Sequence, residues 1–223
     1  MKPVKLNDTL LHETFCEPCC IGIVGGAGTG KTTMALHMAF EMLNAGKAVV
    51  WFNNDMKEYD FMEMLKGIRN EQPLTGSFHV FHFQCMEYDV KKVKEDFEKV
   101  QGTIQGLDQE MGMVVFDTFH PFDQEKRHQV SMYLRDLACK SETRCTVITG
   151  SAGSNLGSTG YVCDYIYETV PQKENGELDY YGCPINIRKN RYNEKYGIFR
   201  QDGPEIMEIP TANGFLKMYN YGE

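Results

Sequence analysis

The residues Gly25-Gly26-Ala27-Gly28-Thr29-Gly30-Lys31-Thr32 decide the fold of this chain. They match G-x-x-x-x-G-K-[ST], the P-loop pattern, in which backbone N–H groups surround the phosphates of a nucleotide. The apolar run at residues 20–24 precedes the loop and predicts a buried strand. Apolar side chains at helical spacing follow from Lys31 to Ala45, and Gly46 ends the helix. Strand, loop and helix therefore stand in the order that a phosphate-binding loop requires.

This loop predicts that the chain binds ATP and Mg²⁺. We expect Lys31 to reach the β- and γ-phosphoryl oxygens and the Thr32 hydroxyl to bind the metal. The predicted nucleotide-binding residues are Gly25, Gly26, Ala27, Gly28, Thr29, Gly30, Lys31, Thr32 and Thr33. The alternative is a glycine-rich turn that matches by chance, and the flanking strand and helix argue against it.

A second motif supports the metal site. Residues 113–116 are apolar and Asp117 follows them, as in the Walker B strand of P-loop proteins. Because parallel strands end at one edge of a sheet, Asp117 is expected beside the P-loop, where it would hold Mg²⁺. The predicted metal site is therefore Thr32 with Asp117.

Composition excludes several classes of protein. The 223 residues include 23 Lys and Arg and 31 Asp and Glu, which gives a net charge of −8. This negative charge argues against an extended basic surface. No apolar run is long enough to span a bilayer, and the N-terminus has no signal-peptide pattern. The eight cysteines lack the paired spacing of a zinc site. These features favour a reduced, cytoplasmic protein that makes no membrane contact.

The order of predicted elements gives the fold class. Strands are expected at 20–24, 48–52, 78–83, 113–117, 145–149 and 163–169, and helices at 31–45, 57–69, 90–104 and 124–140. Further strands are expected at 184–189, 197–200 and 215–219, with a polar hairpin at 171–182. This order predicts an α/β protein: a mainly parallel sheet with helices on both faces and a strand-rich C-terminal part. We divide the chain into a lead-in segment, 1–19, and one domain, 20–223.

Four features beyond the P-loop carry a family resemblance. They are Asn53-Asn54-Asp55-Met56 after the second strand, the Walker B residue Asp117, the strand 147–151, and Lys189-Asn190-Arg191. With them, residues 21–199 resemble the RecA-like motor domain of the DnaB-type hexameric replicative helicases.

That resemblance implies an ATP-hydrolysing motor that acts on single-stranded DNA in replication or recombination, in a phage or mobile element. Asp55 would be the general base that orients water, and Lys189 and Arg191 would enter the active site of a neighbouring subunit. Together with Lys31 and Asp117, these complete the predicted catalytic set. The resemblance also implies a homo-oligomeric ring, a hexamer, with loops 119–128 and 150–160 facing the DNA.

Some residues depart from the helicase pattern and keep alternatives open. Position 55 is Asp where the helicases have Glu, and Ala152 stands where they have a sensor Gln, so hydrolysis would be slow. One alternative is a RecA-like recombination or annealing ATPase, and another is a KaiC-like regulatory ATPase without motor activity. Lys126 and Arg127 could simply begin a helix, and residues 189–191 could form a solvated turn.

Overall fold

The computed structural model describes residues 3–5, 14–16, 18–68, 74–83, 89–119, 123–140, 143, 145–151, 158–169, 172–174, 177–179, 185–190, 205–211 and 214–220. No helix within these residues is long and apolar enough to cross a membrane.

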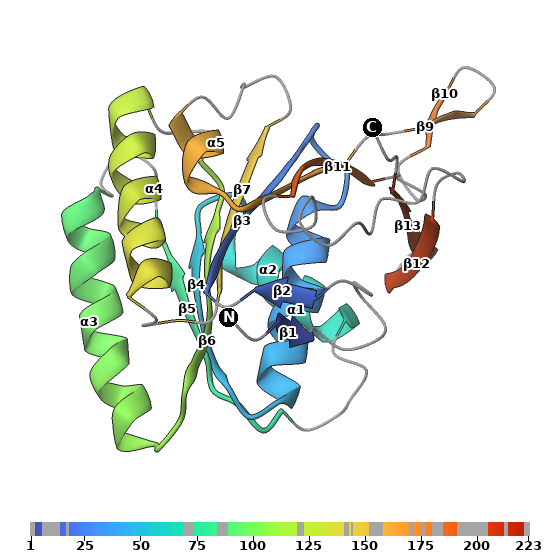
Figure 1. Cartoon of the computed structure of the whole chain (residues 1–223). Coiled ribbons are helices and arrows are strands. Elements are labelled where there is room, and N and C mark those ends of the chain that lie inside the picture. The colour runs from blue at the N-terminus through green and yellow to red at the C-terminus, as the bar shows by residue number, and fades with distance from the viewer. Residues whose placement is uncertain are drawn as a thin grey trace.

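A seven-stranded sheet forms the centre of the molecule, in the order β11-β8-β3-β7-β6-β4-β5 (Figure 1). Six strands run parallel: β3 (Cys19–Gly25), β4 (Ala48–Asn53), β5 (Phe78–His82), β6 (Met111–Asp117), β7 (Cys145–Ser151) and β8 (Tyr165–Thr169). The edge strand β11 (Ile185–Asn190) pairs antiparallel with β8. The predicted α/β class with a mainly parallel sheet is confirmed.

Helices cover both faces of this sheet. They are α1 (Lys31–Asn44), α2 (Glu58–Ile68), α3 (Val90–Gly106), α4 (Gln124–Cys139) and α5 (Ser158–Val162). Figure 1 shows α1 and α2 on one face and α3 and α4 on the other, and α5 packs beside α4. Because both faces are covered, β3, β4, β6 and β8 are buried along their whole length, whereas the edge strand β5 is half-buried.

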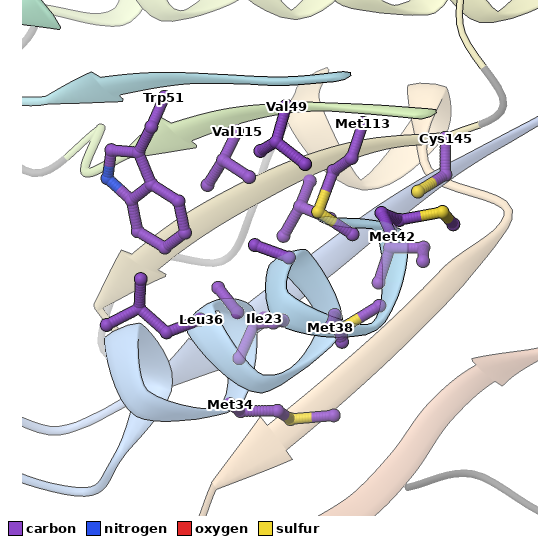
Figure 2. Packing of buried hydrophobic residues seen from close by; sticks show 14 of the residues in the cluster. Ile23, Met34, Leu36, Met38, Met42, Val49, Trp51, Met113, Val115 and Cys145 are labelled. Carbon is purple, nitrogen blue, oxygen red and sulfur yellow. The ribbon is translucent and has the colours of Figure 1, made fainter. Parts of the chain in front are cut away.

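Two hydrophobic cores result, one on each face. Alternation along β3 sends Ile21 and Ile23 toward α1, and Cys20 and Val24 toward α3 and α4. In Figure 2, Val49, Trp51 and Met113 of the sheet lie over Leu36, Met38 and Met42 of α1. These cores fix the positions of the strand ends that carry the candidate site.

Some segments differ from the prediction. Strand β7 continues to Ser151, so the loop predicted from Gly150 begins later, and α5 occupies part of that predicted loop. The strand predicted from Cys163 begins at Tyr165, and the side chain of the preceding Asp164 accepts the Cys20 N–H group. The strand predicted at 197–200 lies outside the described residues.

Three short hairpins complete the description. They are β1 (Pro3–Lys5) with β2 (Thr14–Cys16), β9 (Gln172–Glu174) with β10 (Glu177–Asp179), and β12 (Glu205–Thr211) with β13 (Gly214–Asn220). The expected strand-rich C-terminal part is therefore present, and β12 is a strand that the sequence patterns did not predict. The division into a lead-in and a single domain stays a prediction.

Candidate nucleotide-binding site

The P-loop lies between the carboxyl end of β3 and the first turn of α1. Gly28 and Gly30 have φ angles of 73° and 85°, in the left-handed region that a side chain disfavours. Gly30 is the N-cap of α1 and has no side chain to cap the helix, so the first-turn N–H groups face the loop. The positive end of the helix dipole lies at the same point, and the arrangement suits an anion.

A neighbouring strand anchors the loop. The Thr29 hydroxyl donates to the Gly26 carbonyl at 2.9 Å and lies 2.6 Å from the Thr169 hydroxyl at the end of β8. A Cβ atom on Gly25 would lie only 1.9 Å from the Thr169 Oγ1 atom. Gly25 is therefore required by this close approach of β8 to the loop.

The side chain of Lys31, the first residue of α1, contacts the P-loop backbone. Its Nζ atom donates to the Gly26 carbonyl at 2.6 Å. Burial lowers the pKa of Lys31, while the carboxylates of Asp55 and Asp117 act in the opposite direction. The ammonium group thus lies against the loop backbone, where the charges of both acids act on it.

Asp117 ends β6 and is completely buried. Its Oδ2 atom accepts a hydrogen bond from the Thr32 hydroxyl at 2.9 Å, and its Oδ1 atom accepts one from the Thr149 hydroxyl. The peptide bond from Asp117 to Thr118 is cis. Burial raises the pKa of Asp117 to about 6, although the two hydroxyl donors and Lys31 favour its charged form.

Thr32 and Asp117 fit a magnesium ion. Both present oxygen atoms, which this ion prefers, and a buried carboxylate is stabilised by a nearby cation. Among the described residues, no group of three or more His, Cys, Asp or Glu side chains could hold a metal by itself. The remaining ligands would therefore come from phosphate and water, as is usual for magnesium bound together with a nucleotide.

Asp55 lies on a turn that Asn53 builds at the end of β4. The Asn53 Oδ1 atom accepts the N–H groups of Asp55 and Met56 at 3.3 and 3.4 Å, and its Nδ2 atom donates to the Met56 carbonyl at 2.8 Å. The same Nδ2 atom lies 2.7 Å from the Nδ1 atom of His82 on β5. Asp55 itself is exposed, and its charge acts on both Lys31 and Asp117.

The structure brings the predicted residues Lys31, Thr32, Asp55 and Asp117 together at the carboxyl edge of the sheet. The sequence analysis missed Thr149, which lies near the end of β7 and contacts Asp117, and Thr169, which ends β8 and contacts the P-loop. The only sequence signal for these two site residues was that each follows apolar strand residues. Neither contact could be assigned without the order of strands in the sheet.

The structure describes only some of the residues that were assigned to neighbouring subunits and to DNA. Lys189 belongs to β11, and Arg191 and Ala152 lie outside the described residues. Lys126 and Arg127 lie in the first turn of α4, which agrees with the alternative that they begin a helix and not with a DNA-facing loop at 119–128. Asp123 caps that turn because its Oδ1 atom accepts the N–H group of Lys126 at 2.8 Å. The ring of subunits stays a prediction.

Two comparisons with known proteins gave matches, one to a family model and one to a solved structure. A family model described as ATP:corrinoid adenosyltransferase BtuR/CobO/CobP matches residues 17–173, which include the P-loop, Asp117 and all six parallel strands. A crystal structure of a KaiC-like protein from the hyperthermophilic archaeon Pyrococcus horikoshii OT3 is similar over 97% of this chain and 98% of its own, with 18% identity and a TM-score of 0.67. A search of curated proteins gave no match.

Proposed function

This chain belongs to the ATP:corrinoid adenosyltransferase BtuR/CobO/CobP family, and we propose that it transfers the adenosyl group of ATP to a corrinoid. The family match over residues 17–173 carries this proposal. The P-loop geometry supports it, since the loop offers a binding site for the triphosphate of the adenosyl donor.

The DNA-motor function expected from the sequence is wrong. The matching family is one of transferases that use ATP, and it overturns the helicase, hydrolase, replication and DNA-binding predictions. Lys189 and Arg191 lie beyond the matched residues, so the helicase roles inferred for them have no support from the match. The expected P-loop fold and the use of ATP remain.

Adenosyl transfer breaks a different bond of ATP from the one that hydrolysis breaks. The bond from C5′ to O5′ is cleaved, and its electron pair leaves with the whole triphosphate. The new bond to C5′ uses an electron pair from the corrinoid cobalt, which an external electron donor must first reduce to the Co(I) state. The P-loop would thus hold the leaving group, not the group that is attacked.

The loop residues have clear tasks in such a reaction. Lys31 would leave the Gly26 carbonyl and bind the phosphates, where its charge stabilises the negative charge that develops on the leaving group. Thr32 and Asp117 would hold a magnesium ion, which adds further positive charge at the triphosphate. The N–H groups of the first turn of α1 would fix the phosphates in place.

Adenosyl transfer also accounts for the shorter acid at position 55. Hydrolysis needs a base that orients water, and position 55 carries a shorter acid than the helicases have. Attack on C5′ by a reduced metal needs no such base. Asp55 would instead favour the charged form of Lys31, against the burial that lowers the pKa of this lysine.

The test is to follow the products of ATP. The protein is incubated without oxygen with ATP, Mg²⁺ and hydroxocobalamin that borohydride has reduced. We expect a light-sensitive adenosyl–cobalt product and inorganic triphosphate in equal amounts. A Lys31→Ala variant and a reaction without protein serve as controls. Formation of ADP and phosphate without any adenosylated corrinoid would contradict the proposal.

A further inference from the structure

We infer that Thr149 is a positioning residue, which orients the Asp117 carboxylate toward the metal and nucleotide site. Thr149 lies on β7, between the strand that leads into the P-loop and the strand that ends in Asp117. It belongs to neither sequence motif.

Thr149 makes three hydrogen bonds to the end of β6. Its hydroxyl donates to the Asp117 Oδ1 atom, and its carbonyl accepts the Thr118 hydroxyl at 3.0 Å and the Phe119 N–H group at 3.1 Å. The regular pairing of β6 with β7 ends one residue earlier, at Phe116 and Ile148. Thr149 therefore continues the connection between the two strands at the point where the carboxylate must be fixed.

The two oxygen atoms of the carboxylate have different partners. Oδ2 accepts from Thr32, which belongs to the P-loop side of the site, and Oδ1 accepts from Thr149. A carboxylate held at one oxygen cannot rotate freely, so the other oxygen keeps its direction. Both Asp117 and Thr149 are fully buried, and water therefore does not replace this bond. Hydrogen bonds of this kind to metal-ligating groups change metal affinity by roughly 10- to 100-fold.

The competing explanation is that Thr149 only fills space in the core. Thr146 allows the two explanations to be separated, because it is an equally buried threonine on the same strand. Among the described residues, its side chain interacts with the Cys20 thiol on the neighbouring strand β3 and not with Asp117. Replacing either threonine by valine changes a buried hydroxyl into a methyl group of similar size, but only at position 149 does a bond to Asp117 disappear.

The experiment measures how Mg²⁺ strengthens the binding of a fluorescent ATP analogue, MANT-ATP. Each variant is titrated with the analogue in EDTA and then with Mg²⁺ at a fixed concentration of analogue. We expect Thr149→Val to bind the analogue in EDTA as the wild type does and to need roughly 10- to 100-fold more Mg²⁺. Thr149→Ser, which keeps the hydroxyl, and Thr146→Val should both need the wild-type concentration.

Three results would overturn the inference: an unchanged Mg²⁺ requirement in Thr149→Val, an equal loss in Thr149→Ser, or an equal loss in Thr146→Val. If Thr149→Val does not fold, Thr149→Ser and Thr149→Ala give the same comparison, since they differ by one hydroxyl. The inference rests on Mg²⁺ and ATP at the P-loop, and no corrinoid is used. Its failure is therefore distinguishable from a failure of adenosyl transfer.

Discussion

The Thr32 hydroxyl donates to the Asp117 carboxylate at 2.9 Å and joins the first turn of α1 to the end of β6. These residues are 85 positions apart in the sequence. The bond links the P-loop motif to the Walker B motif, so the two candidate metal ligands lie side by side.

Lys31→Ala should weaken ATP binding by roughly 10- to 100-fold, the worth of a hydrogen bond to a charged group. The fold should be retained, because the described bond of Lys31 is to the Gly26 carbonyl within its own loop. Titration calorimetry with ATP and Mg²⁺ measures the affinity, and circular dichroism checks the fold. Lys47→Ala is the matched control, since that lysine pairs with Glu110 at 2.8 Å. Equal affinity in the two variants would contradict the assignment of Lys31.

Asp117→Asn should change how stability depends on pH in the metal-free protein. The pKa of Asp117 is raised to about 6 from an ordinary value of 3.8, so the folded state favours the protonated acid. The free energy of unfolding should therefore fall as pH rises from about 4 to 6, by about 3 kcal/mol in total. Urea unfolding at several pH values measures this loss. The free energy of unfolding of Asp117→Asn should not show this decrease. If it changed with pH in parallel with that of the wild type, Asp117 would not be the group that causes the decrease.

Arg135→Met should destabilise the protein by about 3 kcal/mol or more, because it removes the cation from a buried carboxylate. The Asp164 side chain is fully buried and accepts from Arg135, and it also accepts the Cys20 N–H group at 2.9 Å. Lys140→Met is the control, since its partner Asp136 is exposed and such pairs are worth about 0–1 kcal/mol. Chemical unfolding compares the two variants. Similar small losses of stability in the two variants would mean that the buried Asp164 carboxylate does not need the charge of Arg135.

Gly25→Ala should impair both stability and ATP binding. The added Cβ atom would lie 1.9 Å from the Thr169 Oγ1 atom and 2.7 Å from the Thr169 carbonyl oxygen, and the latter cannot rotate away. Gly102→Ala on α3 is the matched change, because nothing lies within 4 Å of its added Cβ atom, and it should stabilise the helix by about 0.5–1 kcal/mol. Thermal unfolding measures the stability of the two variants, and MANT-ATP titration measures their affinity for the nucleotide. A Gly25→Ala protein with normal affinity would show that the loop does not need this close approach.

Much of the fold could be predicted from the sequence, because its signals are local. The continuous apolar run that forms β3 and the helical spacing after Lys31 depend only on neighbouring residues. The helix α5 was missed because it has only five residues and follows a segment rich in Gly and Ser. The contacts of Thr149 and Thr169 were missed because they depend on which strands are adjacent in the sheet, and Thr169 meets Thr29 across 140 positions.

The activity was predicted wrongly for a related physical reason. A P-loop fixes where the triphosphate binds, but it does not determine which bond of ATP breaks. The Lys31, Thr32 and Asp117 cluster serves either reaction, since both need the phosphates bound and their charge neutralised. The group that attacks ATP decides the reaction. It comes from outside this cluster, so the motif could not reveal it.

The contact between Thr29 and Thr169 has a consequence for the synthesis of the protein. A ribosome makes the P-loop early, but the strand that anchors it is the last of the six parallel strands to leave the ribosome. A nascent chain shorter than 169 residues would contain the complete motif without the hydroxyl that restrains it. The phosphate-binding loop therefore acquires its native support only after three-quarters of the polypeptide has been translated, when β8 can pair with β3.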